Sequence, residues 1–210
     1  MGEQTSRSRG SRISELSDLF LSMTPESQRP PLPRVLEPTT VETFQVGSGV
    51  VHVPKGVPRF RLWTGEPPGD SYGGKPILHG PDGPAFAELV VLGLLREGGW
   101  DGVWVDTYRN RFRTSYWGED RNVPLPTVPA GALARILECR GQGRSGTWDV
   151  FVWRGPHVLF AECKRAGKDQ IRPSQTTFLD AALREQFPLQ SFLVVEWSAT
   201  SASARTSHVV

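Results

Sequence analysis

Two short apolar segments separated by a tight turn constrain the fold of this chain more than any other feature. The first covers residues 146–153 (Gly-Thr-Trp-Asp-Val-Phe-Val-Trp) and the second covers residues 158–164 (Val-Leu-Phe-Ala-Glu-Cys-Lys). Both segments are rich in β-branched and aromatic residues, and residues 154–157 between them (Arg-Gly-Pro-His) have the composition of a turn. The pattern predicts a β-hairpin.

The register of this hairpin decides which side chains meet. If the turn is symmetric about Gly155 and Pro156, Asp149 lies directly opposite Glu162. Opposed residues in an antiparallel pair have Cβ atoms about 5 Å apart. Lys164 lies two residues beyond Glu162 and therefore points to the same side of the sheet. Two carboxylates and one ammonium are expected to share one patch.

Such a carboxylate pair calls for a cation, because the two charges repel each other and are costly to remove from water. Mg²⁺ and Mn²⁺ prefer hard oxygen ligands, and a bound ion can polarise a phosphodiester and acidify a water molecule. Lys164 can orient that water or stabilise the charge that develops on phosphorus. The alternative is a structural ion pair between Lys164 and one of the carboxylates at a sheet edge.

Length and composition allow one ordinary domain with tails, since the chain has 210 residues and a mass of 23.2 kDa. With 24 basic and 22 acidic residues the net charge is +2, so the positions of the charges matter more than their sum. Cys139 and Cys163 provide no disulfide framework, and the sequence contains no signal peptide or membrane-spanning apolar run. We therefore expect a cytoplasmic protein with no membrane partner.

Four regions are expected along the chain. They are a disordered basic and Pro-rich tail (1–40), which includes one short amphipathic helix (14–23), a β-hairpin and loop extension (41–83), an α/β domain (84–197) and a disordered tail (198–210). Within the domain we expect the order helix (85–97), strand (100–108), the two hairpin strands, helix (173–186) and strand (191–197). An insertion (109–129) and a short helix (131–139) precede the hairpin.

Two polar residues lie on the apolar faces of the expected helices. Glu88 falls between Leu92 and Leu95 on a helix that is apolar over most of its circumference, so its carboxylate needs a partner. If the helix packs against the hairpin, that partner is a metal ion, bound directly or through another ligand; alternatively, Glu88 lies in an exposed sector or near the positive end of the helix dipole. Gln175 heads the stripe of the second helix and either reaches toward Lys164 or a phosphate, or makes a local capping contact.

Basic residues flank the carboxylate pair on both sides. Clustered Lys and Arg residues and the amino termini of helices both attract phosphate. We therefore expect a groove for the nucleic-acid backbone, with a solvated basic surface as the alternative; the residues are Arg140, Arg144, Arg165, Lys168 and Arg172.

Residues 140–197 resemble the VRR-NUC domain of the PD-(D/E)xK nuclease superfamily. In that family an Arg/Gly-rich approach leads to Gly-x-Pro-Asp, an apolar strand, a Glu-x-Lys strand, a basic loop and a Gln that opens a helix. The matching residues here are Gly146, Asp149, Glu162, Lys164 and Gln175, with Glu88 in the place of an upstream helical Glu. Trp148 departs from the pattern, since the family has a structural Pro at that position.

This resemblance implies a restriction-endonuclease-like core and Mg²⁺- or Mn²⁺-dependent cleavage of branched or flapped DNA, as in DNA repair. It implies that Asp149, Glu162 and the carbonyl of Cys163 bind the metal, and that Lys164 positions the attacking water. A homodimer is expected because symmetric cutting of a junction needs two sites, with residues 41–53 and 109–129 as candidate interfaces. The alternatives are a catalytically silent nucleic-acid-binding module of the same fold and an RNA nuclease.

Overall fold

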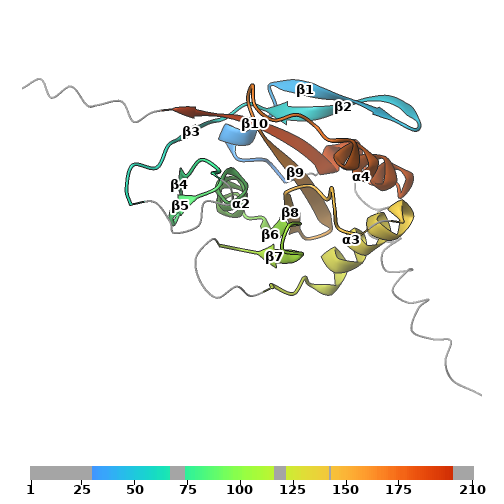
Figure 1. The fold of residues 1–210 in the computed structure, drawn as a ribbon. Coiled ribbons are helices and arrows are strands. Elements are labelled where there is room, and N and C mark those ends of the chain that lie inside the picture. Colours follow the sequence, from blue (N-terminus) through green and yellow to red (C-terminus); the bar gives the residue numbers. More distant parts are fainter. Residues whose placement is uncertain (1–29, 67–73, 116–121, 142, 201–210) are drawn as a thin grey trace, which may run out of the picture.

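The structure is a computed structural model that describes residues 30–66, 74–115, 122–141 and 143–200 (Figure 1). Its centre is an eight-stranded mixed sheet. The spatial order is β1 (Thr40–Val46), β2 (Gly49–Gly56), β10 (Phe192–Thr200), β9 (His157–Arg165), β8 (Val150–Arg154), β6 (Asp101–Asp106) and β7 (Arg111–Arg113), with β3 (Arg59–Arg61) paired to β10. A separate two-stranded sheet is formed by β4 (Leu78–Gly80) and β5 (Gly83–Ala85).

Helices cover both faces of the large sheet and divide the apolar core into two parts (Figure 1). One face packs against α2 (Ala87–Glu97), and the other packs against α3 (Thr127–Arg140) and α4 (Pro173–Arg184). The side chains of β8 alternate accordingly, with Val150 and Val152 in the α2 core and Phe151 in the α3/α4 core. The predicted mixed α/β class is confirmed.

The predicted hairpin and its register are confirmed. Strands β8 and β9 pair antiparallel with Val150 opposite Ala161 and Arg154 opposite His157. This register continues the symmetry about Gly155 and Pro156, so Asp149, the residue before β8, reaches the level of Glu162. Because side chains alternate along both strands, the two carboxylates lie on the same side of the sheet. They are located at the start of β8, where the preceding loop joins the sheet.

The segment before α2 was predicted as loop, and the structure corrects this. Residues 78–85 form the β4–β5 hairpin, so Pro84 belongs to a strand and the helix begins at Ala87. Three-residue strands are too short to show a periodic pattern, which is why the Gly- and Pro-rich composition concealed them. The predicted helix end is confirmed, because α2 stops at Glu97 and Gly99 takes φ = 80°.

Ordered structure starts before the expected position near residue 41, which corrects the expected tail of residues 1–40. Residues 34–36 form a 3₁₀ helix, η2 (Arg34–Leu36), and Leu36 is 0% exposed in the α2 core. At the other end, β10 continues to Thr200, three residues beyond the expected strand. Residues 1–29, with the expected helix over 14–23, and residues 201–210 lie outside the described residues.

The insertion expected over residues 109–129 contains regular structure. Strand β7 pairs with β6, and α3 begins at Thr127 rather than at Gly131. Pro129 lies in the first turn of α3, where its missing N–H has no intrahelical partner to lose. Residues 116–121 lie outside the described part. Within the described ranges, none of the helices has the length and apolar character needed to cross a membrane.

Candidate active site

The structure brings Asp149 and Glu162 together as the hairpin register predicts. Asp149 Oδ2 accepts a hydrogen bond of 3.0 Å from the backbone N–H of Cys163, the neighbour of Glu162. The two carboxyl groups are close enough to interact electrostatically and by hydrogen bonding. Glu162 is only 1% exposed, whereas Asp149 is partly open to solvent. Glu162 is therefore the more deeply buried residue of the pair, and Asp149 is half-buried.

The environment disfavours two full negative charges on this pair. Burial raises the pKa of Asp149 to about 6, and the charge of Glu88 adds to this effect. Burial also holds the pKa of Glu162 well above its usual range, and the charge of Asp149 reinforces the shift. The Cys163 thiol has a raised pKa for the same first reason, its burial, and remains neutral. Burial thus opposes ionisation of both carboxyl groups, and Lys75 and Lys164 offset it only in part.

The lysine and the glutamine beside Glu162 both donate to the same oxygen of its carboxylate. Its Oε1 accepts hydrogen bonds from Lys164 Nζ at 2.9 Å and from Gln175 Nε2 at 2.5 Å. Its Oε2 is buried and has no hydrogen-bond partner among the described residues. A buried carboxylate oxygen without a partner is costly, so this atom is suited to bind a cation.

Gln175 makes the predicted capping contact, and its other end reaches Glu162 rather than Lys164. Its Oε1 accepts a hydrogen bond of 2.8 Å from the backbone N–H of Arg172, which caps the start of α4, while its Nε2 donates to Glu162. The same side chain therefore closes the first turn of the helix and holds the carboxylate. Because these two bonds use opposite ends of one amide, the position of α4 and the orientation of Glu162 are linked.

Trp148 packs against the helix that carries Gln175, a role that the sequence did not predict. It is fully buried, and its indole Nε1 donates a hydrogen bond of 3.2 Å to the backbone carbonyl of Gln175. Its ring meets Phe192 edge-on at 5.1 Å and stacks on Phe44 at 5.9 Å. The only warning in the sequence was that this residue replaces the Pro of the family pattern.

Glu88 reaches the same cluster from α2, where it lies in the first turn and is buried. Its Oε1 forms an ion pair with Lys75, a residue that the sequence analysis did not select. Burial opposes the charge on Lys75, but the charges of Glu88 and Asp149 raise its pKa overall. Lys75 stands alone in a Gly- and Pro-rich segment, so no local pattern marks it.

The predicted basic groove is only partly supported. Arg140 must be removed from it, because this residue is 8% exposed, donates to the carbonyls of Gly143 and Ser145, and lies over the ring of Phe178 at 5.9 Å. Its guanidinium holds the loop that leads to Asp149.

The other four basic residues remain at least partly accessible. Arg144 lies 4.3 Å above the ring of Phe112, and Arg165 lies 5.9 Å from that of Trp197. Lys168 and Arg172 are exposed. The accessible cations thus come from the loops on either side of the hairpin.

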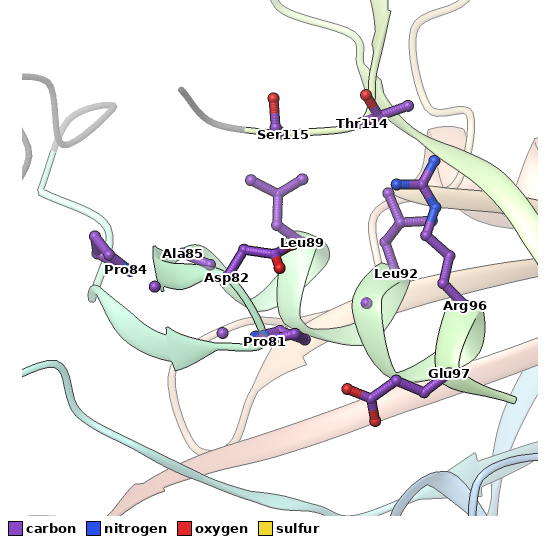
Figure 2. A pocket seen from close by; sticks show the side chains of 13 residues that line it. Pro81, Asp82, Pro84, Ala85, Leu89, Leu92, Arg96, Glu97, Thr114 and Ser115 are labelled. Carbon is purple, nitrogen blue, oxygen red and sulfur yellow. The ribbon is translucent and has the colours of Figure 1, made fainter. Parts of the chain in front are cut away.

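A separate cavity of about 290 Å³ lies between α2, the turn of the β4–β5 hairpin and the residues after β7 (Figure 2). Figure 2 shows Leu89, Leu92 and Arg96 of α2 beside it, with Thr114 and Ser115 across from them. Neither the carboxylate pair nor Lys164 contributes to its lining. The cavity is therefore distinct from the carboxylate cluster.

The donors of the carboxylate cluster are hard oxygen atoms, which suit Mg²⁺ or Mn²⁺. Within the described ranges, no three His, Cys, Asp or Glu side chains are already arranged to hold a metal ion. The candidate ligands for such an ion are Asp149, Glu162 Oε2, the carbonyl of Cys163 and Glu88. Comparison of the chain with protein-family models, curated proteins and solved structures returned no match.

Proposed function

We propose that this protein is a nuclease of the PD-(D/E)xK type that uses Mg²⁺ or Mn²⁺ to hydrolyse phosphodiester bonds in DNA. The observation that carries the proposal is the buried Oε2 of Glu162, which accepts no hydrogen bond from the described residues, beside the half-buried Asp149. A purely structural ion pair with Lys164 would need one carboxylate, and Lys164 contacts only Oε1. That ion pair does not account for Oε2 of Glu162 or for the second carboxylate beside it.

The order of elements supports a restriction-endonuclease-like core. Helix α2, strands β6, β8 and β9, helix α4 and strand β10 occur in the order helix, three strands, helix, strand, with β7 and α3 inserted between β6 and β8. The four strands are neighbours in the sheet, and β10 lies parallel to β9. This arrangement agrees with the resemblance to VRR-NUC domains, which rests on Asp149, Glu162, Lys164 and Gln175.

Each residue of the cluster has a defined task in this mechanism. A divalent ion at this site would lower the pKa of a water molecule and polarise the phosphodiester. Asp149 and Glu162 Oε2 would hold the ion together with the Cys163 carbonyl. Lys164, fixed by its 2.9 Å contact with Glu162, would donate a hydrogen bond to the attacking water and orient it toward phosphorus. Gln175 keeps Oε1 occupied, so Oε2 remains available.

The substrate and the assembly are further parts of the proposal. Arg144, Arg165, Lys168 and Arg172 would contact phosphates on both sides of the scissile bond, and the family resemblance favours branched or flapped DNA. A homodimer would supply two sites, and the exposed Val41 and Val50 make the β1–β2 hairpin a candidate interface. A cytoplasmic location fits the two free cysteines.

A cleavage panel tests the function directly. Linear, nicked, flapped and four-way DNA, with a matched RNA set, is incubated with Mg²⁺, Mn²⁺ or EDTA. We expect metal-dependent cutting that Asp149→Asn and Glu162→Gln abolish and that Glu185→Gln preserves, since Glu185 pairs with Arg135 outside the cluster. Cleavage of RNA alone would make the protein an RNA nuclease, and binding without cleavage would make it a silent nucleic-acid-binding module.

A further inference from the structure

Lys75 contacts the carboxylate cluster from outside the hairpin motif. It precedes β4 in the chain, yet its ammonium forms an ion pair with the buried Glu88 of α2. The same ammonium lies 5.7 Å from the ring centre of Phe86 and 6.0 Å from that of Trp104, within cation–π range of both. The ammonium therefore contacts two aromatic rings as well as the Glu88 carboxylate.

The charges of the cluster divide into two sets. Lys164 binds Glu162, while Lys75 pairs with Glu88 and also acts electrostatically on Asp149. Three carboxylates thus share two ammonium groups, and each buried acid has a cation nearby. The charge of Lys75 acts on Asp149, the less deeply buried of the two residues predicted to bind the metal. A divalent ion that binds Asp149 would meet a like charge there.

We propose that Lys75 is an internal counter-cation of this site, which balances Glu88 and Asp149 in the metal-free protein and moves away when a divalent metal ion binds. The inference rests on the proposed function, because it assumes a metal site at Asp149 and Glu162. The side chain of Lys75 is 43% exposed, so its ammonium can turn toward solvent while the apolar core stays packed. The displaced ammonium would then be available to a phosphate of the substrate.

This arrangement has a measurable consequence for metal affinity. The ammonium keeps the carboxylates from repelling each other in the absence of metal, and it competes with the incoming ion. A unit charge about 6 Å from a divalent ion in a medium with the dielectric constant of water changes its affinity roughly tenfold. Removing the charge of Lys75 should therefore strengthen binding of Mn²⁺, because the ion no longer competes with an ammonium group for the carboxylates.

Titration calorimetry with Mn²⁺ on the full-length protein tests this consequence. Lys75→Met keeps an unbranched side chain to pack on Phe86 and Trp104, and it should bind Mn²⁺ about tenfold more tightly than the unmodified protein. Lys75→Arg retains the charge and should resemble the unmodified protein. Lys55→Met is the matched control, since Lys55 pairs with Glu42 at 2.9 Å in the β1–β2 hairpin and should leave the affinity unchanged.

A second measurement needs no variant that could fail to fold. The unmodified protein is treated with a limiting amount of an amine-acetylating reagent, with and without Mn²⁺, and each lysine is quantified by mass spectrometry. We expect Mn²⁺ to increase acetylation of Lys75 several-fold, because its ammonium is released. The exposed Lys168 should react equally under both conditions.

The outcomes separate this inference from the proposed function. Unchanged or weaker Mn²⁺ binding by Lys75→Met, or acetylation of Lys75 that does not respond to Mn²⁺, would overturn the inference while the metal site stands. Asp149→Asn should abolish Mn²⁺ binding with either residue at position 75. If the unmodified protein binds no more Mn²⁺ than Asp149→Asn does, the metal site fails, and the proposed function and the inference fail with it.

Discussion

Gln175 Nε2 donates a hydrogen bond of 2.5 Å to Glu162 Oε1, which joins the first turn of α4 to the middle of β9. The other end of the same amide accepts the backbone N–H of Arg172. Glu162 is therefore oriented by a residue that is itself fixed by the helix it begins. Gln175 is a positioning residue, because it acts on the reaction through Glu162.

Replacing Gln175 should impair the reaction more than substrate binding. Gln175→Ala removes a hydrogen bond to a charged group, a loss of about 1.5–3 kcal/mol, so we expect kcat to fall roughly ten- to hundredfold with little change in KM. Thr177→Ala, which removes a 2.9 Å bond to the Pro173 carbonyl on the same helix, is the control and should keep its kcat. Equal kcat values for the two variants would contradict the positioning role.

The raised pKa of Asp149, about 6, predicts an unusual dependence of stability on pH. A carboxyl group whose pKa is higher in the folded than in the unfolded protein binds more protons when folded, so the metal-free protein should lose stability as pH rises from about 4 to 6. The loss is of the order of 3 kcal/mol. Glu162 shifts in the same direction and adds to it.

Denaturant unfolding across this pH range provides the measurement. Asp149→Asn removes the titrating group while keeping an acceptor for the Cys163 N–H, so it should flatten the profile and raise the stability of the metal-free protein at neutral pH. Saturating Mn²⁺ should reverse the trend in the unmodified protein, because metal binding requires the ionised carboxylates. A profile that Asp149→Asn leaves unchanged would contradict the assignment.

Trp148→Pro would restore the family residue, yet we expect it to destabilise this chain. The indole fills the space between Phe44, Phe192 and α4, and a large buried aromatic ring contributes about 3–5 kcal/mol when its removal leaves a cavity. Trp148→Phe should cost less, since it mainly loses the bond to the Gln175 carbonyl. Urea unfolding, with the partly exposed Trp153→Phe as control, would decide; wild-type stability of Trp148→Pro would refute this account.

Neutralising Lys168 and Arg172 together should flatten the plot of log affinity for duplex DNA against log salt. Each lost phosphate contact should reduce the slope by roughly 0.9, as measured by fluorescence anisotropy over a NaCl series. Arg184→Ala is the control, because Arg184 pairs with Asp180 near the end of α4. An unchanged slope in the double variant would place the DNA elsewhere on the surface.

Leu36 predicts where the folded unit begins. A chain that starts at Pro30 should unfold like the full-length protein, whereas a chain that starts at Thr39 loses the fully buried Leu36 and should be less stable by about 2–5 kcal/mol. Thermal and urea unfolding of both truncations, with Leu36→Ala in the full-length chain, provide the test. Equal stability of the two truncations would show that η2 contributes nothing to the core.

The hairpin and the helix that carries Gln175 could be predicted because their signals are local. Strands repeat every two residues and helices every 3.6, so β8, β9 and α4 follow from composition and spacing, and the meeting of Asp149 with Glu162 follows from the turn. Lys164 lies on the same strand as Glu162, so its position in the cluster could be predicted as well. These parts of the candidate site involve residues within one hairpin and the helix after it.

Only the tertiary structure decided the contacts between segments that are distant in the chain. Lys75 meets Glu88 across the β4–β5 hairpin, Leu36 enters the core against α2, and Arg140 turns inward to hold the loop before Asp149. A charged residue has the same local pattern whether it faces solvent or an interior carbonyl, because its burial depends on which surfaces pack against it. The packing of the two helical layers on the sheet decides whether such a residue is buried. This packing leaves no periodic pattern in any one segment of the sequence.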